Sequence, residues 1–228
     1  MDNTSFKPFF SAYEALSSSA DRAFATVAGQ FPECVKCKPL CSDCCYATFD
    51  LTLVEALYIN HRFNMNFDQH PPEELLEKCN KVDRELYKIK KRAYRSLESG
   101  KDEKDIIFEM AELRIRCPML NTEEMCDIYE FRPITCRLYG IPTAINGEGY
   151  TCGLSEFQKG VTYPTANMDQ IQNKLLQLSA ELVTAIASKH TRMGEILVPL
   201  SMALTTIYDD GYLGISKDDT RQPVTQNP

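Results

Sequence analysis

The sequence predicts a mainly α-helical domain wrapped around an irregular, cysteine-rich knot. Apolar residues recur at helical spacing along most of the chain, but two segments, 34–50 and 115–153, lack that periodicity and contain nine of the ten cysteines. A chain of 228 residues can bury a hydrophobic core without the help of disulfides. We therefore expect a single helical domain over residues 1–215, followed by a polar, disordered tail over 216–228.

Two helices are expected ahead of residue 70. Residues 8–29 carry large apolar side chains at spacings of three, four or seven, which is the pattern of one helix face. Thr52 and Glu55 then form a capping-box pattern directly before the sequence LVEALYINHRF. In such a box the two side chains bind each other's backbone N–H groups, so the pattern predicts the start of a second helix at Thr52.

Four further helices are expected from the same periodicity. Two prolines precede a long helix over 73–98, whose apolar stripe includes Cys79, and a glycine follows its end. Shorter helices are predicted over 103–114, 168–190 and 196–208. Cys79 therefore has the position of a small core residue rather than of a metal ligand.

The cysteines of the two irregular segments are candidate metal ligands, and those of the first segment have the close spacing typical of such ligands. Two or three intervening residues let a loop double back, so that both thiolates reach one metal at about 2.3 Å. The chain begins without a secretory signal and contains no apolar stretch long enough to span a membrane, which predicts a cytoplasmic protein with reduced thiols. The cysteines concerned are Cys34, Cys37, Cys41, Cys44, Cys45, Cys117, Cys126, Cys136 and Cys152.

Nine clustered thiols exceed the needs of one mononuclear site, which takes four ligands. The count fits two four-cysteine centres, or one iron–sulfur cluster with a second site. Neighbouring residues point apart in both strands and helices, so we expect the thiols of Cys44 and Cys45 to diverge, either to two centres or with only one of them on a metal. Adjacent cysteines suit a polynuclear centre better than a simple zinc ribbon, so an iron–sulfur cluster is slightly favoured over zinc.

The order of these elements resembles the YkgJ-like cysteine cluster family, a family of zinc- or iron-chelating domains. The likeness covers about residues 34–153 and rests on a knot that ends in adjacent cysteines, a CPML element and the long element CDIYEFRPITCR. It implies eight metal ligands: Cys37, Cys41, Cys44, Cys45, Cys117, Cys126, Cys136 and Cys152. Three residues separate Cys37 from Cys41 where the family more often has two, which leaves Cys34 open as the first ligand.

Two arginines bracket Cys136 in the long element. A centre with four thiolates carries net negative charge, and nearby cations offset that charge and tune the metal. We therefore expect Arg132 and Arg137 to support the bound cofactor. The alternative is that they form surface ion pairs with Glu130 or Glu55.

The net charge of the chain and the motifs that it lacks argue against several classes of function. A net charge of −7 speaks against a general nucleic-acid binder, and no nucleophile–base pair or phosphate loop is visible. We expect a metalloprotein in electron transfer, metal handling or assembly, with an unidentified protein or redox partner and no binding to nucleic acid or membranes. A cluster-dependent methyl- or redox-transfer enzyme and a structural zinc module for protein interaction are the alternatives, so the enzyme class stays open.

Overall fold

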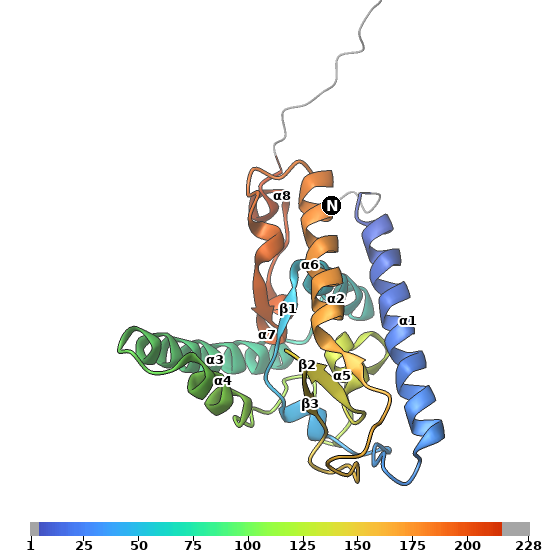
Figure 1. Ribbon diagram of the computed structural model, residues 1–228. Coiled ribbons are helices and arrows are strands. Elements are labelled where there is room, and N and C mark those ends of the chain that lie inside the picture. Colours follow the sequence, from blue (N-terminus) through green and yellow to red (C-terminus); the bar gives the residue numbers. More distant parts are fainter. Residues whose placement is uncertain (1–4, 216–228) are drawn as a thin grey trace, which may run out of the picture.

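The computed structural model describes residues 5–215, and the expected tail 216–228 lies outside them. The mainly α prediction is confirmed, and most of the long elements in Figure 1 are helices. Eight α-helices occur in the described part of the chain: α1 (Lys7–Gln30), α2 (Leu53–Asn66), α3 (Glu73–Glu98), α4 (Glu103–Ala111), α5 (Ile134–Leu138), α6 (Met168–Ala185), α7 (Leu200–Thr205) and α8 (Asp210–Leu213).

Short elements fill the segments between the long helices. They are the 3-10 helices η1 (Asp43–Tyr46), η2 (Tyr129–Phe131) and η3 (Met193–Glu195) and the strands β1 (Asp50–Thr52), β2 (Thr143–Ile145), β3 (Glu148–Tyr150), β4 (Ala166–Asn167) and β5 (Leu197–Pro199). Strand β1 pairs antiparallel with β5, while β2 pairs antiparallel with β3 and parallel with β4. The sequence did not predict these strands, because two or three residues are too few to show an alternating pattern.

The helix expected over 196–208 is wrong in its first half. Strand β5 occupies the start of that range, and Val198 pairs with Leu51 of β1. Pro199 explains the break, because a proline keeps the residue before it extended and is tolerated at the start of a helix. The helix that follows, α7, is therefore only six residues long. The helix expected to reach residue 190 likewise stops at Ala185, two residues before Ala187 takes a positive φ of 49°.

The capping box expected at Thr52 is also wrong, because neither of its two side chains makes the expected hydrogen bond. Thr52 does occupy the N-cap position of α2, but its side chain makes no capping hydrogen bond. Glu55 is only 3% exposed, and its Oε1 atom instead accepts hydrogen bonds from the Tyr13 hydroxyl (2.8 Å) and the Ile134 backbone N–H (2.9 Å). The carboxylate thus links three distant segments rather than closing its own helix.

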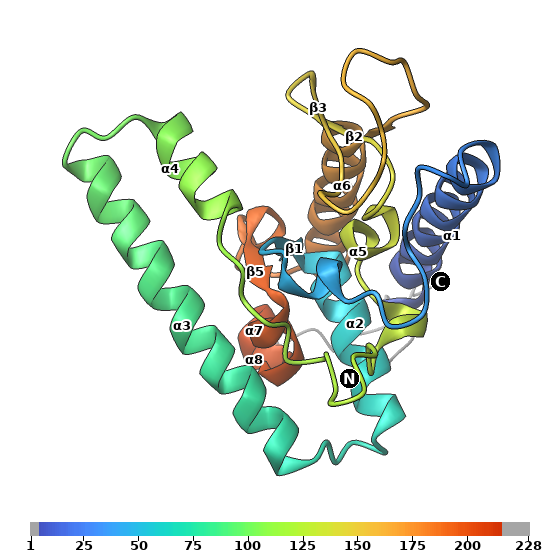
Figure 2. The ribbon, with the colours of Figure 1, turned by 90° about the horizontal axis from the view of Figure 1, so that it is seen from below.

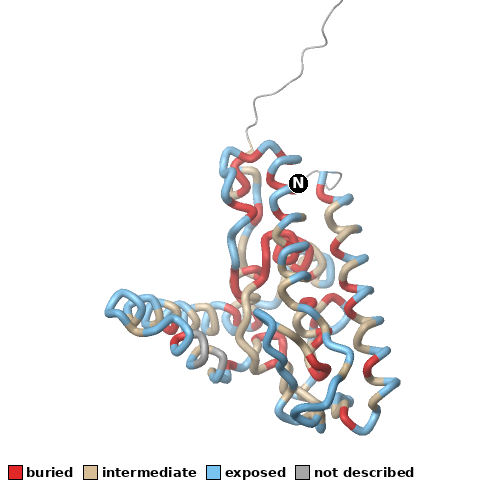
Figure 3. The backbone as a smooth tube through the Cα atoms, viewed as in Figure 1, coloured by how far each residue is buried: buried red, intermediate tan, exposed pale blue. Residues whose placement is uncertain are grey.

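Helix α2 lies at the centre of the fold. Most of its residues are buried, and it contacts α1, α6 and α7. Helices α1 and α6 lie side by side and cross α2, while α3 and α4 lie together and project away from the rest of the chain (Figures 1 and 2). Buried residues gather around α2 and along the inner sides of its neighbours, whereas the far end of α3 is largely exposed (Figure 3). The irregular segments with the cysteines are held between these two parts.

Candidate metal centre

Eight cysteines line one cavity of about 700 Å³. They are the eight for which metal binding was expected, and they come from both irregular segments: Cys37, Cys41, Cys44, Cys45, Cys117, Cys126, Cys136 and Cys152. Val82 and Leu86 of α3 contribute an apolar wall opposite the knot. All ten cysteines of the chain are free thiols, so the cavity presents sulfur donors rather than disulfides.

Backbone hydrogen bonds join the two cysteine segments beside the cavity. The N–H of Cys117 donates to the carbonyl of Cys45 at 2.7 Å, and the N–H of Ile115 donates to the carbonyl of Tyr46 at 3.2 Å. The two segments are thus paired through main-chain atoms alone, whatever the side chains at these positions. This pairing brings thiols more than seventy positions apart to the same wall of the cavity.

The adjacent residues Cys44 and Cys45 both line the cavity, and the expected divergence of their thiols to separate positions stays a prediction. Both residues lie in the 3-10 turn η1, and the Cys45 thiol is near enough to those of Cys44 and Cys126 for the three to alter one another's pKa. The Cys45 thiol lowers the pKa of Cys44 to about 7 and also lowers the pKa of Cys126. The Cys126 thiol in turn raises the pKa of Cys45.

Cys117 and Cys136 complete this deeper part of the cavity. Burial raises the pKa of Cys117 to about 12 and raises the pKa of Cys136 well above its usual value. The other charges that act on Cys136 include those of Cys44, Cys117 and Cys126, so the deeper thiols are mutual neighbours. We refer to Cys45, Cys117, Cys126 and Cys136 as the inner thiols. Metal binding would have to overcome the preference of Cys117 and Cys136 for the neutral thiol form.

Three further thiols lie nearer the mouth of the cavity, and we call Cys37, Cys41 and Cys152 the outer thiols. Cys37 and Cys41 also line a second hollow on the outside of the knot. Although Cys37 is an exposed residue, its Sγ atom lies 3.6 Å from the carbonyl oxygen of Tyr139, and burial raises the pKa of the thiol to about 11. Gly140 has a φ of +103°, and a Cβ atom at this position would overlap the Cys37 Sγ atom. Only glycine allows so close an approach of backbone and thiol.

Asp43 is a residue of the cavity that the sequence analysis did not single out. Its Oδ2 atom lies 3.5 Å from Cys152 Sγ and accepts a hydrogen bond from the Tyr139 hydroxyl at 2.9 Å. Its Oδ1 atom pairs with Arg114 at 2.5 Å. Burial alone would raise the pKa of Asp43, but the hydrogen bonds from Arg114, Tyr139 and Cys152 outweigh it and lower the pKa. Its position between Cys41 and Cys44 was the available signal.

Arg132 lies at the cavity beside the thiols, and its role in offsetting their charge stays a prediction. It lines the cavity, and its guanidinium carbon sits 3.9 Å from the centre of the Tyr129 ring. After the Cys45 thiol, the charge of Arg132 is a further cause of the lowered pKa values of Cys44 and Cys126. The structure thus places a cation where an anionic centre would benefit from it.

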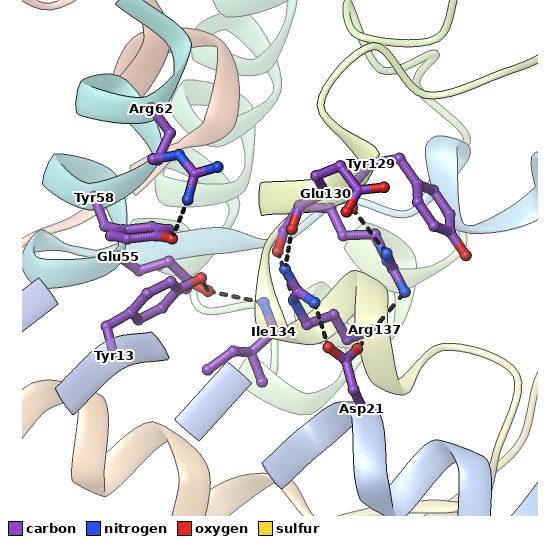
Figure 4. Close-up of polar contacts among 10 residues, drawn as sticks. Tyr13, Asp21, Glu55, Tyr58, Arg62, Tyr129, Glu130, Ile134 and Arg137 are labelled. Carbon is purple, nitrogen blue, oxygen red and sulfur yellow. Dashed lines mark hydrogen bonds and ion pairs between the residues drawn. The ribbon is translucent and has the colours of Figure 1, made fainter. Parts of the chain in front are cut away.

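Arg137 has a different set of partners. It is buried and pairs with Asp21 of α1 at 2.6 Å, while its other N–H groups donate to the carbonyl oxygens of Glu130 (2.7 Å) and Arg132 (3.1 Å). Figure 4 shows the guanidinium between these groups. Neither the Glu130 carboxylate nor Glu55 is its ion-pair partner. Arg137 therefore ties α5 to α1, although it also contributes to the cavity lining.

The two remaining cysteines do not line the cavity. Cys34 is buried in the first segment with its thiol 3.8 Å from the Glu33 carboxylate. Cys79 is fully buried in the hydrophobic core, as expected from its place on the apolar stripe of α3. Of the two candidates for the first cysteine of the knot, Cys37 is the one at the cavity.

The donor set of the cavity fits a thiophilic metal, although the donors do not yet converge on one point. Among residues 5–215, no group of three or more His, Cys, Asp or Glu side chains is close enough together to hold one ion. Eight sulfurs around one cavity are nevertheless the ligands that zinc and iron–sulfur clusters take. Metal binding would draw these thiols inward, and the free energy of binding would add to the stability of the knot.

A family model described as "Putative zinc- or iron-chelating domain" matches residues 36–153. The match covers just over half of the chain, contains all eight cavity cysteines and begins after Cys34. No curated protein and no solved structure gives a significant match. Within the described residues, no helix combines the length and the apolar character needed to cross a bilayer.

Proposed function

Because the chain belongs to this family of zinc- or iron-chelating domains, we propose that its eight-thiol cavity holds a metal centre, with an iron–sulfur cluster favoured over zinc. The observation that supports this most strongly is the gathering of eight thiols from two segments around a single cavity. Buried structural cysteines act as small apolar residues and do not need one another. Eight of them at one cavity therefore point to a shared ligand.

The size of the cavity and the number of thiols favour iron. A single tetrahedral zinc ion takes four ligands at about 2.3 Å and fills little space. The cavity holds about 700 Å³ and twice that number of thiols, which suits a polynuclear centre or more than one centre. Arg132 beside the thiols would offset part of the negative charge of such a centre and tune its potential.

We further propose that the protein serves electron transfer, metal handling or assembly rather than substrate turnover. Cys37 and Cys41 line both the inner cavity and the outer hollow, so the thiols extend from the interior to the surface. A centre with an exposed edge can exchange electrons or metal with a partner protein. Redox partners typically meet through small, transient interfaces, and an exposed edge of the centre would suit such an interface.

Anaerobic purification followed by elemental analysis and a visible absorption spectrum tests this proposal. We expect iron and sulfide with the broad visible absorption of an iron–sulfur cluster, whereas zinc is d¹⁰ and colourless. A Cys79→Ser variant is the matched control, because Cys79 lies outside the cavity and its metal content should equal that of the wild type. A protein with only trace amounts of any transition metal would refute the metal centre itself.

A further inference from the structure

Apart from Cys44, the cavity thiols fall into two groups, and we propose that the outer thiols Cys37, Cys41 and Cys152 form a second metal site together with the carboxylate of Asp43. This site would take a single divalent ion of the zinc class, separate from the centre on the inner thiols. The inference rests on the proposed function, because it assumes that the cavity binds metal. It adds a ligand that is not a cysteine and assigns the inner and the outer thiols to two sites.

The positions of the outer thiols support this division. Cys37 and Cys41 line the outer hollow together with Asp43, and the Cys152 Sγ atom lies 3.5 Å from the Asp43 Oδ2 atom. Only Cys37 and Cys41 reach the outer hollow, and no inner thiol does. Cys44 lines the cavity but not the outer hollow, and it belongs to neither group.

The outer group contains three thiols, and Asp43 provides the missing fourth donor. Its Oδ2 atom lies 3.5 Å from Cys152 Sγ. In a tetrahedral site with metal–sulfur bonds of about 2.3 Å and metal–oxygen bonds of about 2.0–2.2 Å, two such ligands lie about 3.5–3.7 Å apart. This one pair has the separation of two ligands on one ion, and Cys37 and Cys41 would have to move inward to complete the site, because no three such side chains of residues 5–215 converge. Asp43 also contributes to the lining of the inner cavity and of the outer hollow, as Cys37 and Cys41 do.

Asp43 is held as ligating carboxylates are held in metal sites. Arg114 pairs with its Oδ1 atom, which leaves Oδ2 to face Cys152, and the Tyr139 hydroxyl fixes the orientation of that second oxygen. Carboxylates and imidazoles that bind metals are commonly oriented by such outer partners. Arg114 would also offset part of the charge of three thiolates and a carboxylate around a dication.

The donor types select the ion. Three thiolates with one carboxylate form a four-coordinate set of mixed sulfur and oxygen, which zinc accepts and which magnesium or calcium, with their preference for oxygen, do not. The outer hollow gives an ion a route from solvent, since Cys37, Cys41 and Asp43 line it. Lys38 lines both hollows and adds another positive charge beside the site.

The test is a titration of the full-length, chelator-treated protein with Co²⁺, whose visible spectrum reports tetrahedral thiolate coordination. We expect wild type to bind one Co²⁺ more per chain than Cys152→Ser, and Asp43→Ala to bind that ion at least about tenfold more weakly. The metal of the inner thiols should stay unchanged in both variants. Asp43→Cys should restore tight binding with stronger thiolate-to-cobalt absorption, and Asp105→Ala, which removes an exposed carboxylate on α4, should match wild type.

The outcomes separate the two proposals. Wild-type affinity for every Co²⁺ in Asp43→Ala would overturn Asp43 as a ligand. If Cys152→Ser lost both the metal of the inner thiols and the additional Co²⁺, the eight thiols would form one centre. If Asp43→Ala does not fold, Asp43→Cys still decides, because a fourth thiolate must strengthen the cobalt absorption. A wild-type protein that binds no metal at all would instead refute the proposed function.

Discussion

The Glu55 carboxylate of α2 accepts a hydrogen bond from the backbone N–H of Ile134 at 2.9 Å (Figure 4). Ile134 is the first residue of α5, the short helix that carries Cys136. A fully buried acid from the core therefore fixes the start of the helix that presents an inner thiol. The Tyr13 hydroxyl donates to the same carboxylate oxygen, so α1 is tied into the same contact.

Removing the Glu55 carboxylate should destabilise the protein and lower its metal content. In Glu55→Ala, the Tyr13 hydroxyl and the Ile134 N–H would lose a buried acceptor, at about 1–3 kcal/mol each. We expect the free energy of unfolding, measured by chemical denaturation, to fall by about 2–5 kcal/mol. Glu77→Ala, which removes an exposed glutamate of α3, is the control and should change it by less than about 0.5 kcal/mol. Equal losses in both variants would contradict the role of Glu55.

Two cysteine substitutions should differ sharply in their effect on metal content. Cys79→Ala shortens a core side chain outside the cavity, so it should keep the metal and cost only on the order of 1 kcal/mol of stability. Cys136→Ala removes an inner thiol and should lower both metal content and stability. Metal per chain is measured by elemental analysis of the purified variants. Wild-type metal content in Cys136→Ala would show that this thiol is not a ligand.

Gly140→Ala should disturb the outer thiols. The alanine would be strained at a φ of +103°, and its Cβ atom would overlap the Cys37 Sγ atom. Gly147→Ala is a matched control, because Gly147 has a φ of +79° with nothing within 4 Å of an added Cβ atom. Both variants should lose about 1–3 kcal/mol from backbone strain, but only Gly140→Ala should also weaken metal binding. Metal titration beside thermal unfolding separates the two effects, and equal affinities would argue against a role for this contact.

The Arg137–Asp21 pair should stabilise the fold more than a surface ion pair does. Arg137 is buried and also binds two carbonyl oxygens, while Asp21 is about half exposed, so we expect Arg137→Ala to cost about 2–4 kcal/mol. Arg192→Ala, which breaks an exposed pair with Glu195, should cost less than about 1 kcal/mol. Urea denaturation of both variants measures the difference. Similar losses would mean that burial adds nothing to the Arg137 contacts.

The long helices could be predicted because each buries one stripe of apolar residues. The bounds 73–98 agree with α3, and 8–29 lies within one residue of α1 at either end. The local periodicity of a helix is complete within its own sequence, so no tertiary information is needed. The strands, in contrast, are held by partners far along the chain, as in the pairing of Leu51 with Val198.

The cysteines of the candidate site could be predicted from their clustering in two segments and from the family resemblance, but the residues that support them could not. The eight cysteines of the cavity match the expected ligands, which remain a prediction until metal is measured. Glu55 had the sequence pattern of a capping box, yet tertiary contacts with Tyr13 and Ile134 took precedence. Asp43 stands between two cysteines of the knot, but its contacts could not be predicted because its partners Arg114 and Tyr139 lie more than seventy residues away.

X-ray absorption spectroscopy at the metal edge of the anaerobically purified protein tests the central claim most directly. We expect a first shell made up mainly of sulfur, at about 2.3 Å from the metal, as thiolate ligands require. For an iron–sulfur cluster, the iron should in addition show neighbouring iron atoms beyond that sulfur shell. A first shell of nitrogen and oxygen at about 2.0–2.2 Å, with no sulfur, would contradict metal binding by the cavity thiols.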